Sequence, residues 1–168
     1  MSATPLTPTA GHRYLPSGVR QYYWVDTIAD ISAPIRSELD AGTDLTAELA
    51  DMGGFTVSSK PVDAPDLASR FTSKVPGMIE ADDSSLNIYL SKEGGSDVRT
   101  LLPRDTEGYI VVFPEGDDSS SGSKTLDVFP VTVSEQSLQP DFDKPGVVVI
   151  GFTVTAEPKQ NIVIPATV

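Results

Sequence analysis

Short segments with the period-two alternation of β-strands recur along the chain. The clearest is Val147–Ala156, where every second residue from Val148 is apolar, which predicts a strand with one buried face. Leu86–Leu90 alternates in the same way, and Tyr22–Val25 is an aromatic strand near the start. Tyr109–Phe113 is apolar on both faces, as is typical of a central strand covered on both sides. Strands therefore dominate the prediction.

The segment Thr125–Ser134 changes phase along its length. Its apolar residues fall on even positions up to Val128 and on odd positions from Phe129 to Val133, and the change lies beside Pro130. A β-bulge or bend at this point restores an inward-facing side after one extra residue. We therefore expect an irregular strand here.

Two or three short helices are also expected, because 14 prolines and 13 glycines leave no long helical pattern. Ser32 is a candidate N-cap with Pro34 in the first turn, and Gly42 ends this helix. A weaker helical spacing covers residues 45–52, and Asp97 can cap a turn or two that ends at Leu102. Such short helices have to pack on the sheets.

The segment from Thr56 to Val75, TVSSKPVDAPDLASRFTSKV, has weak strand patterning at its ends and prolines in the middle. We interpret it as a long hairpin arm, polar on both sides and mobile in an isolated monomer. Leu67 and Phe71 then lack an intramolecular site, which is typical of a segment that orders against a neighbour. A solvated loop is the alternative.

Composition limits the possible classes of protein. A chain of 168 residues fits one domain with a hydrophobic core, and no stretch approaches the roughly 18 apolar residues of a membrane-spanning helix. The N-terminus does not resemble a secretory signal, which predicts synthesis in the cytoplasm. The absence of cysteine excludes disulfides, thiolate nucleophiles and thiolate metal sites.

The net charge of −12 is concentrated in one region. Residues 105–143 carry nine carboxylates and a single base, Lys124. A surface of this sign repels phosphate, so tight binding to nucleic acid is disfavoured. Solubility is the simpler explanation of the acidity.

No residue pattern predicts an active site or a cofactor. The only histidine, His12, lies in a Pro- and Thr-rich leader, and the common nucleotide-binding and nucleophile motifs are missing. Asp117–Gly122 imitates part of a calcium loop, but Val128 stands where the bidentate Glu belongs, so a hairpin turn is expected. The carboxylates at 82–83 and 115–118 lie in turn-like contexts and are expected to be solvated.

The stretch Ile31–Thr46, ISAPIRSELDAGTDLT, resembles the early segment of major tail tube proteins of long-tailed, siphovirus-type bacteriophages, especially those of actinobacterial hosts. The order of features along the chain is also similar. A single tail tube domain over 1–168 would comprise an N-terminal extension (1–20), an inter-ring hairpin arm (56–76) and a C-terminal tail (159–168).

This resemblance implies a mainly β fold: a β-sandwich or partial barrel of two packed antiparallel sheets, with one to three short helices and the long arm. It implies a non-enzymatic virion subunit whose hexameric rings stack into a hollow tube. Its partners would be further copies of itself and the tape measure, tail terminator and tail-tip or baseplate proteins. DNA would pass through the lumen without specific binding, and no membrane would be involved.

The resemblance also implies roles for individual residues. The contacts of the arm with the next ring would come from Ser58, Lys60, Val62, Leu67, Arg70 and Phe71. The acidic residues expected to face the lumen, where they repel DNA, are Asp63, Asp66, Glu135 and Glu157.

Two other functions stay open from the sequence. The inner tube of a contractile tail or injection system shares the expected fold and differs by a surface that binds a sheath. A β-sandwich carbohydrate-binding or adhesin module would use Trp24 with Tyr22 and Tyr23 as an aromatic platform, although aromatic strands more often belong to a core.

Overall fold

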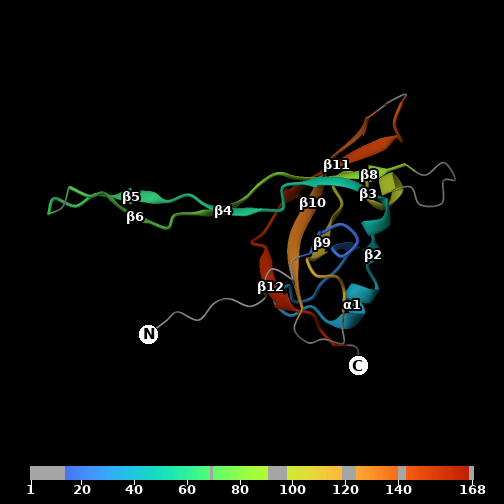
Figure 1. The fold of residues 1–168 in the computed structure, drawn as a ribbon, viewed down its shortest axis with the longest axis horizontal. Coiled ribbons are helices and arrows are strands. Elements are labelled where there is room, and N and C mark those ends of the chain that lie inside the picture. Colours follow the sequence, from blue (N-terminus) through green and yellow to red (C-terminus); the bar gives the residue numbers. More distant parts are fainter. Residues whose placement is uncertain (1–13, 69, 91–97, 119–123, 140–142, 167–168) are drawn as a thin grey trace.

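The computed structural model describes residues 14–68, 70–90, 98–118, 124–139 and 143–166 (Figure 1). Short helices and one 3₁₀ turn, Thr46–Glu48, accompany a set of β-strands. The helices are α1 (Arg36–Asp40) and α2 (Val98–Leu101). The strands are β1 (Gln21–Val25), β2 (Thr43–Asp44), β3 (Leu49–Gly53), β4 (Val57–Ser59), β5 (Val62–Ala64), β6 (Ser73–Val75), β7 (Ile79–Ala81), β8 (Ser84–Tyr89), β9 (Glu107–Phe113), β10 (Thr125–Gln139), β11 (Val147–Val154) and β12 (Lys159–Val163).

The body is one antiparallel sheet of eight strands in the order β2-β1-β9-β10-β11-β8-β3, with β12 also paired to β10. Three strands separate β1 from β8, yet both contribute to the same hydrophobic cluster. The rings of Trp24 on β1 and Phe152 on β11 lie 6.3 Å apart between centroids. The sheet therefore curls around its core, which confirms the mainly β fold, and the two expected layers are halves of one continuous sheet.

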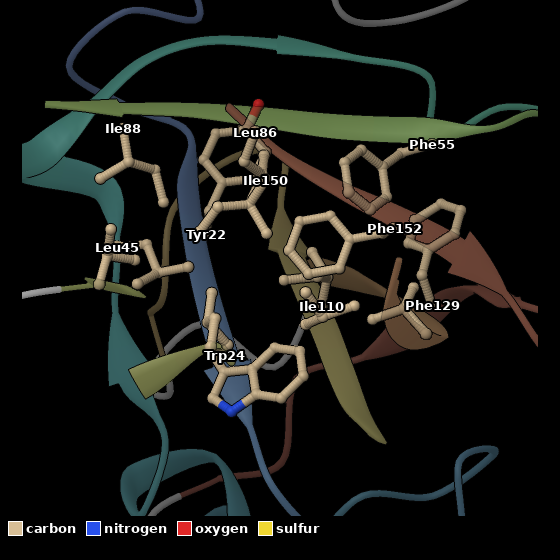
Figure 2. Close-up of a cluster of buried hydrophobic side chains, with 14 of the residues drawn as sticks. Tyr22, Trp24, Leu45, Phe55, Leu86, Ile88, Ile110, Phe129, Ile150 and Phe152 are labelled. Atoms are coloured by element: carbon tan, nitrogen blue, oxygen red, sulfur yellow. The ribbon is translucent and has the colours of Figure 1, made fainter. Parts of the chain in front are cut away.

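Two hydrophobic clusters lie on opposite faces of β9, because Ile110 and Val112 belong to one and Val111 and Phe113 to the other. The larger cluster is drawn in Figure 2 and fills the inside of the curl. Its most enclosed aromatic members are Trp24 and Phe152, each with 1% of its surface exposed. The smaller cluster lies beneath α1 and the last strand.

The phase change in β10 has a different origin from the predicted bulge. Leu126 and Val128 belong to the smaller cluster, whereas Phe129 and the following odd-numbered residues belong to the larger one. The register with β9 runs without interruption from Asp127 to Thr132, so the bulge expected beside Pro130 is wrong on this edge. The first part of β10 buries one face against the smaller cluster, and the part from Phe129 buries the opposite face against the larger cluster. The apolar residues therefore change from even to odd positions without a bulge in the register with β9.

Pro130 lies where the other edge of β10 changes its partner. Residues up to Val128 pair with β12 and residues from Val131 pair with β11, while the Pro130 carbonyl accepts a hydrogen bond from Thr155 N–H at 3.0 Å. The nitrogen and carbonyl of a strand residue point to the same side. The missing N–H of proline therefore faces the gap between the two partner strands.

The helices are shorter than expected. α1 begins at Arg36, so its N-cap is Ile35 and the prediction of Ser32 as the cap is wrong. The Glu38 carboxylate accepts hydrogen bonds from the N–H groups of Ile35 at 3.1 Å and Ala29 at 2.9 Å. Residues 45–52 form the 3₁₀ turn and the end strand β3 in place of a helix, because pairing with β8 overrides the weak helical spacing. α2 is present, and its expected cap, Asp97, lies outside the described residues.

The predicted strands are confirmed, and the C-terminal segment requires a correction. Lys159–Val163, expected to be part of a tail, is strand β12 of the main sheet. Ile164 is buried, and its N–H donates to the Lys124 carbonyl at 3.0 Å. No helix within the described ranges is long and apolar enough to cross a membrane.

Candidate assembly surfaces

A long two-stranded arm projects from the body, between β3 and β8 (Figure 1). Strand β4 pairs with β7 near the body, and β5 pairs with β6 further out. The expected boundaries of 56–76 left out β7, so the arm extends to residue 82. We call residues 56–82 the arm.

The two faces of the arm differ in character, which corrects the expectation of a hairpin polar on both sides. In its outer part, Val62 lies opposite Val75 on one face, and Asp63 lies opposite Lys74 on the other. The second pair is an ion pair at 3.2 Å. Near the body, Lys60 forms an ion pair with Glu80. The outer part of the arm is therefore amphipathic, and ion pairs join the two strands of the arm both near the body and further out.

The apolar residues of the arm are exposed. Leu67 at its outer end is 109% exposed and Phe71 is 77% exposed. Val62, Val75, Met78 and Ile79 are each more than half exposed. Ser58, Lys60 and Arg70, the polar members of the predicted contact set, are also on the surface. Exposed apolar side chains gathered on one projecting segment are typical of an interaction surface.

The root of the arm is held firmly in the core. Gly54 and Phe55 both have positive φ angles, +77° and +55°, and a Cβ at Gly54 would lie 2.4 Å from the Asp83 carbonyl oxygen. Phe55 N–H donates to Ser84 Oγ at 2.8 Å, and its ring meets Phe129 edge-on at 5.4 Å (Figure 2). Sequence reasoning missed this anchor, because a turn followed by a single aromatic residue has no periodic signal.

A second surface lies on the side of β3, β8, β11 and β10 that faces away from the larger cluster. Strand pairing places Gly53, Ser85, Gly151 and Glu135 in one row across these strands. The next row contains Asp51, Asn87, Val149 and Ser137. We call these eight residues the polar face; they include two carboxylates and no base.

Both flanking strands of the polar face have an edge available for pairing. Among the described residues, β3 pairs only with β8, and β10 beyond Glu135 pairs only with β11. Open strand edges are templates for pairing with another chain. The polar face can therefore continue into a neighbouring molecule at both sides.

Residues 7–167 match the family model described as phage tail tube protein. The chain belongs to this family. No curated protein sequence matches it significantly. The family is that of a virion component, as the resemblance of Ile31–Thr46 led us to expect. The match does not bear on a host, so an actinobacterial host stays a prediction.

Solved structures share the fold of this tail tube protein at low identity. A chain of the sheath–tube complex of the extracellular contractile injection system PVC has a TM-score of 0.61 at 10% identity, covering 94% of this chain and 100% of that one. The SPP1 tail tube gives 0.55 at 11% identity, with 87% and 78% covered. A chain of the sixfold-symmetrised baseplate of the anti-feeding prophage gives 0.57 at 9% identity, with 93% and 97% covered.

The predicted lumen acids of the tail tube protein lie in different places. Glu135 is on the polar face, where Gly151 leaves room for it, since a Cβ there would lie 2.6 Å from Glu135 Cγ. Asp63 and Asp66 are on the arm, and Glu157 lies in the β11–β12 turn, 3.4 Å from Lys159. Asp51 also lies on the polar face, and no sequence pattern indicated it, because only the pairing of β3 with β8 brings it there.

One acid that we expected to be solvated is buried. The Asp117 side chain is 7% exposed and binds Arg36 through two hydrogen bonds of 2.5 and 2.7 Å. Tyr23 OH also donates to it at 3.2 Å, and burial, followed by the Asp117 charge, raises the pKa of Tyr23 to about 12. The hydrogen bond to Asp117 also raises the pKa of Arg36. This network joins α1 to the connection after β9.

The calcium-like positions 119–122 lie outside the described residues. Within the described ranges, no group of three or more His, Asp and Glu residues is placed to hold a metal ion. Tyr22 and Trp24 are buried in the larger cluster, so they do not form the surface platform of a carbohydrate-binding module. The indole Nε1 of Trp24 instead donates to Asp26 at 2.6 Å.

Proposed function

We propose that the subunit closes into hexameric rings in which the polar face lines a continuous lumen. The observation that carries this proposal is the four-stranded polar face with an open strand edge at each side. Pairing β3 of one copy with the β10 edge of the next is a head-to-tail contact. Such a contact generates a closed ring when the rotation that relates neighbouring copies is a whole fraction of a full turn. The sixfold baseplate that contains a similar fold supports six copies.

The chemistry of the polar face suits a conduit for DNA. Its small side chains and two carboxylates, Asp51 and Glu135, offer no cation that would hold a phosphate. A carboxylate-lined wall repels the duplex from every side, so DNA passes without a fixed binding site. Asp63, Asp66 and Glu157 are further candidates where the arm and the β11–β12 turn meet the lumen.

The arm would connect successive rings. Its predicted contact residues, Ser58, Lys60, Val62, Leu67, Arg70 and Phe71, combine exposed apolar groups with hydrogen-bonding and charged ones. Burying a fully exposed Leu or Phe side chain contributes roughly 1.5–3 kcal/mol, so a few such contacts per subunit stabilise a stack of rings. The N-terminal extension (1–20) and the last residues of the chain would add further contacts.

The subunit acts without turnover, by assembly alone. It would be synthesised in the host cytoplasm and incorporated into the virion tail. There it would meet the tape measure protein inside the growing tube, the tail terminator at one end and the tail-tip or baseplate proteins at the other. We expect these partners because a tube of defined length needs one protein that sets its length and a different protein at each of its two ends.

Single cysteines introduced into the cysteine-free chain test the proposed lumen. Electron microscopy of the concentrated protein is expected to reveal rings or hollow filaments. In these assemblies, Ser137→Cys on the polar face should react with a small maleimide and be protected from a large polyethylene glycol maleimide. Ser37→Cys, on the exposed side of α1, is the matched control and should react with both.

Two results would contradict this proposal. One is the absence of rings and filaments under all conditions, including incubation with tail-initiation components. The other is a Ser137→Cys variant that reacts fully with the large reagent along the length of intact tubes.

The inner tube of a contractile machine is a second candidate, favoured by the fold shared with the PVC sheath–tube complex. It requires an outer surface that binds a sheath protein. Isolation of intact particles with a tagged subunit decides between the two: a stoichiometric sheath protein around the tube supports the contractile reading, and bare tubes support the non-contractile one.

A further inference from the structure

Each of the two flanking strands of the polar face contains a β-bulge. The pairing of β3 with β8 skips Ala50, and the pairing of β10 with β11 skips Ser134. The two strands between them, β8 and β11, pair without interruption. The irregularities of the polar face therefore lie only in the strands whose outer edges are open.

The bulges explain which side chains reach the polar face. Val133 belongs to the larger cluster, so a regular strand would turn Glu135, two residues later, toward that cluster as well. Leu49 and Met52 both pack against the larger cluster although they are three residues apart, and Asp51 between them faces away. Removing the extra residue from either strand would restore plain alternation and leave all of these side chains on their present faces.

Gly151 makes room for the bulge in β10. A Cβ at this position would lie 2.6 Å from Glu135 Cγ and 3.0 Å from Ser134 Oγ. Both side chains of the bulge therefore extend over the same glycine. They border a polar hollow of about 360 Å³, which Ser85 and Thr153 also line. The shape of β11 is thus matched to the bulge in β10.

The bulge in β10 lies where the free edge of this strand begins. Up to Thr132 that edge pairs with β9. The N–H of Val133 donates to the Thr106 carbonyl, and the Val133 carbonyl accepts from the Asp105 N–H, each at 2.9 Å. Beyond the bulge, β10 has no strand partner on this side among the described residues. Because a bulge bends its strand and increases the local twist, it turns the free end of β10 relative to the part that is held by β9.

A closed ring requires a curved wall. With six copies, each four-stranded wall has to turn through about 60°. Flat sheets do not close into barrels, and bulges at defined positions introduce the curvature that closure needs. In this subunit the bulges are in the two strands that would meet at the contact between neighbouring copies.

We propose that the bulges at Ala50 and Ser134 set the angle between neighbouring subunits and therefore the diameter of the ring. Both are positioning residues, since they act through the direction that they give to the edges of β3 and β10. The inference rests on the proposed function, because it concerns the edges through which the ring closes. It adds that one extra backbone residue in each strand, and not the chemistry of its side chain, determines how far the wall turns.

Deletion of a bulged residue tests this inference. One variant lacks Ala50 and another lacks Ser134, and circular dichroism and thermal unfolding check that each monomer folds. The charge of the polar face is unchanged, because alternation keeps Asp51 and Glu135 on it. Electron microscopy of end-on views then gives the diameter and the number of copies. We expect a single diameter for the wild-type protein, and rings with more copies or open arcs for each deletion variant, because the wall turns less.

Substitutions that retain the bulge are the matched controls. Ser134→Ala and Ala50→Ser keep the length of the strands and should form rings of wild-type diameter. Ser134→Gly and Ala50→Gly also keep the length but loosen the bend, because glycine has more conformational freedom. These two variants should give a broad distribution of diameters. They decide the question if the deletion variants do not fold, and a single wild-type diameter in both would then overturn the inference.

The outcomes separate the inference from the function on which it rests. Folded deletion variants whose rings have the wild-type diameter or a smaller one would overturn the role of the bulges and leave the ring itself intact. A change in Ser134→Ala as large as in the deletion would assign the effect to the hydroxyl group, which also overturns the inference. If the wild-type protein forms no rings, the proposed function itself fails.

Discussion

Arg36 and Asp117, which are 81 residues apart in the sequence, form a two-pronged ion pair between α1 and the connection that follows β9. Their nitrogen–oxygen distances are 2.5 and 2.7 Å, and the Asp117 N–H is held in turn by Gln21 Oε1 at 2.6 Å. The pair connects α1, which lies within the stretch Ile31–Thr46, to the segment that follows the central strand β9. Because the Asp117 side chain is buried, we expect this pair to stabilise the folded subunit.

Asp117→Asn should destabilise the monomer by about 1–3 kcal/mol, because it removes the carboxylate that accepts hydrogen bonds from Arg36 and Tyr23. Chemical denaturation of the isolated subunit measures the loss. Asp40→Asn is the matched control: Asp40 also contacts Arg36, at 2.6 Å, but its side chain is 54% exposed. The control should lose about 0.5 kcal/mol or less. Equal losses in both variants would contradict a special role for the buried partner.

The same network predicts a stability change in alkaline solution. Folding raises the pKa of Tyr23 from 10.0 to about 12, so its protonated form is favoured in the folded state. Its contribution is complete below pH 10 and declines as the pH rises toward 12. Ultraviolet titration of tyrosinate should detect one late-titrating group that is lost in Tyr23→Phe. A wild-type protein and variant with identical stability profiles in this window would refute the prediction.

The apolar anchor at the root of the arm and an apolar residue at its outer end should behave in opposite ways. Phe55→Ala removes a ring from the core and is expected to cost about 3–5 kcal/mol of monomer stability. Leu67→Ala should leave the monomer unchanged, because the side chain is fully exposed, and should weaken tube formation. Thermal unfolding measures the first effect and sedimentation of assembled tubes the second. A large loss of monomer stability in Leu67→Ala would mean that the arm packs on its own body.

Gly108→Ala should destabilise the core by about 1–3 kcal/mol, since overpacking forces side chains out of favourable rotamers. A Cβ at this position would lie 2.4 Å from the Trp24 ring. Near-ultraviolet circular dichroism and tryptophan fluorescence report the displaced indole. Gly146→Ala is the control, because its Cβ would approach only the flexible end of Leu90, at 3.3 Å. An unchanged indole spectrum in Gly108→Ala would argue against this close contact.

Local patterns were sufficient for the strands and for the position of the arm. Period-two alternation in residues 147–154 and a two-sided apolar run at 109–113 are properties of adjacent residues, so they predict strands without knowledge of the partners. The prolines and weak patterning after Thr56 likewise marked a segment outside the core. Ile31–Thr46 indicated the family that the match over residues 7–167 establishes.

The sequence by itself therefore determined the kind of elements, the acidity and the family. Only the tertiary structure decided which residues share a surface, because each surface depends on pairing between strands that are distant in the chain. Asp51 and Glu135 meet on the polar face through β8 and β11, and Asp117 is buried because Arg36 folds over it. The sequence around a carboxylate in a turn is the same whether the carboxylate contacts water or a guanidinium. Only the packing of residues distant in the sequence decides which of the two it contacts.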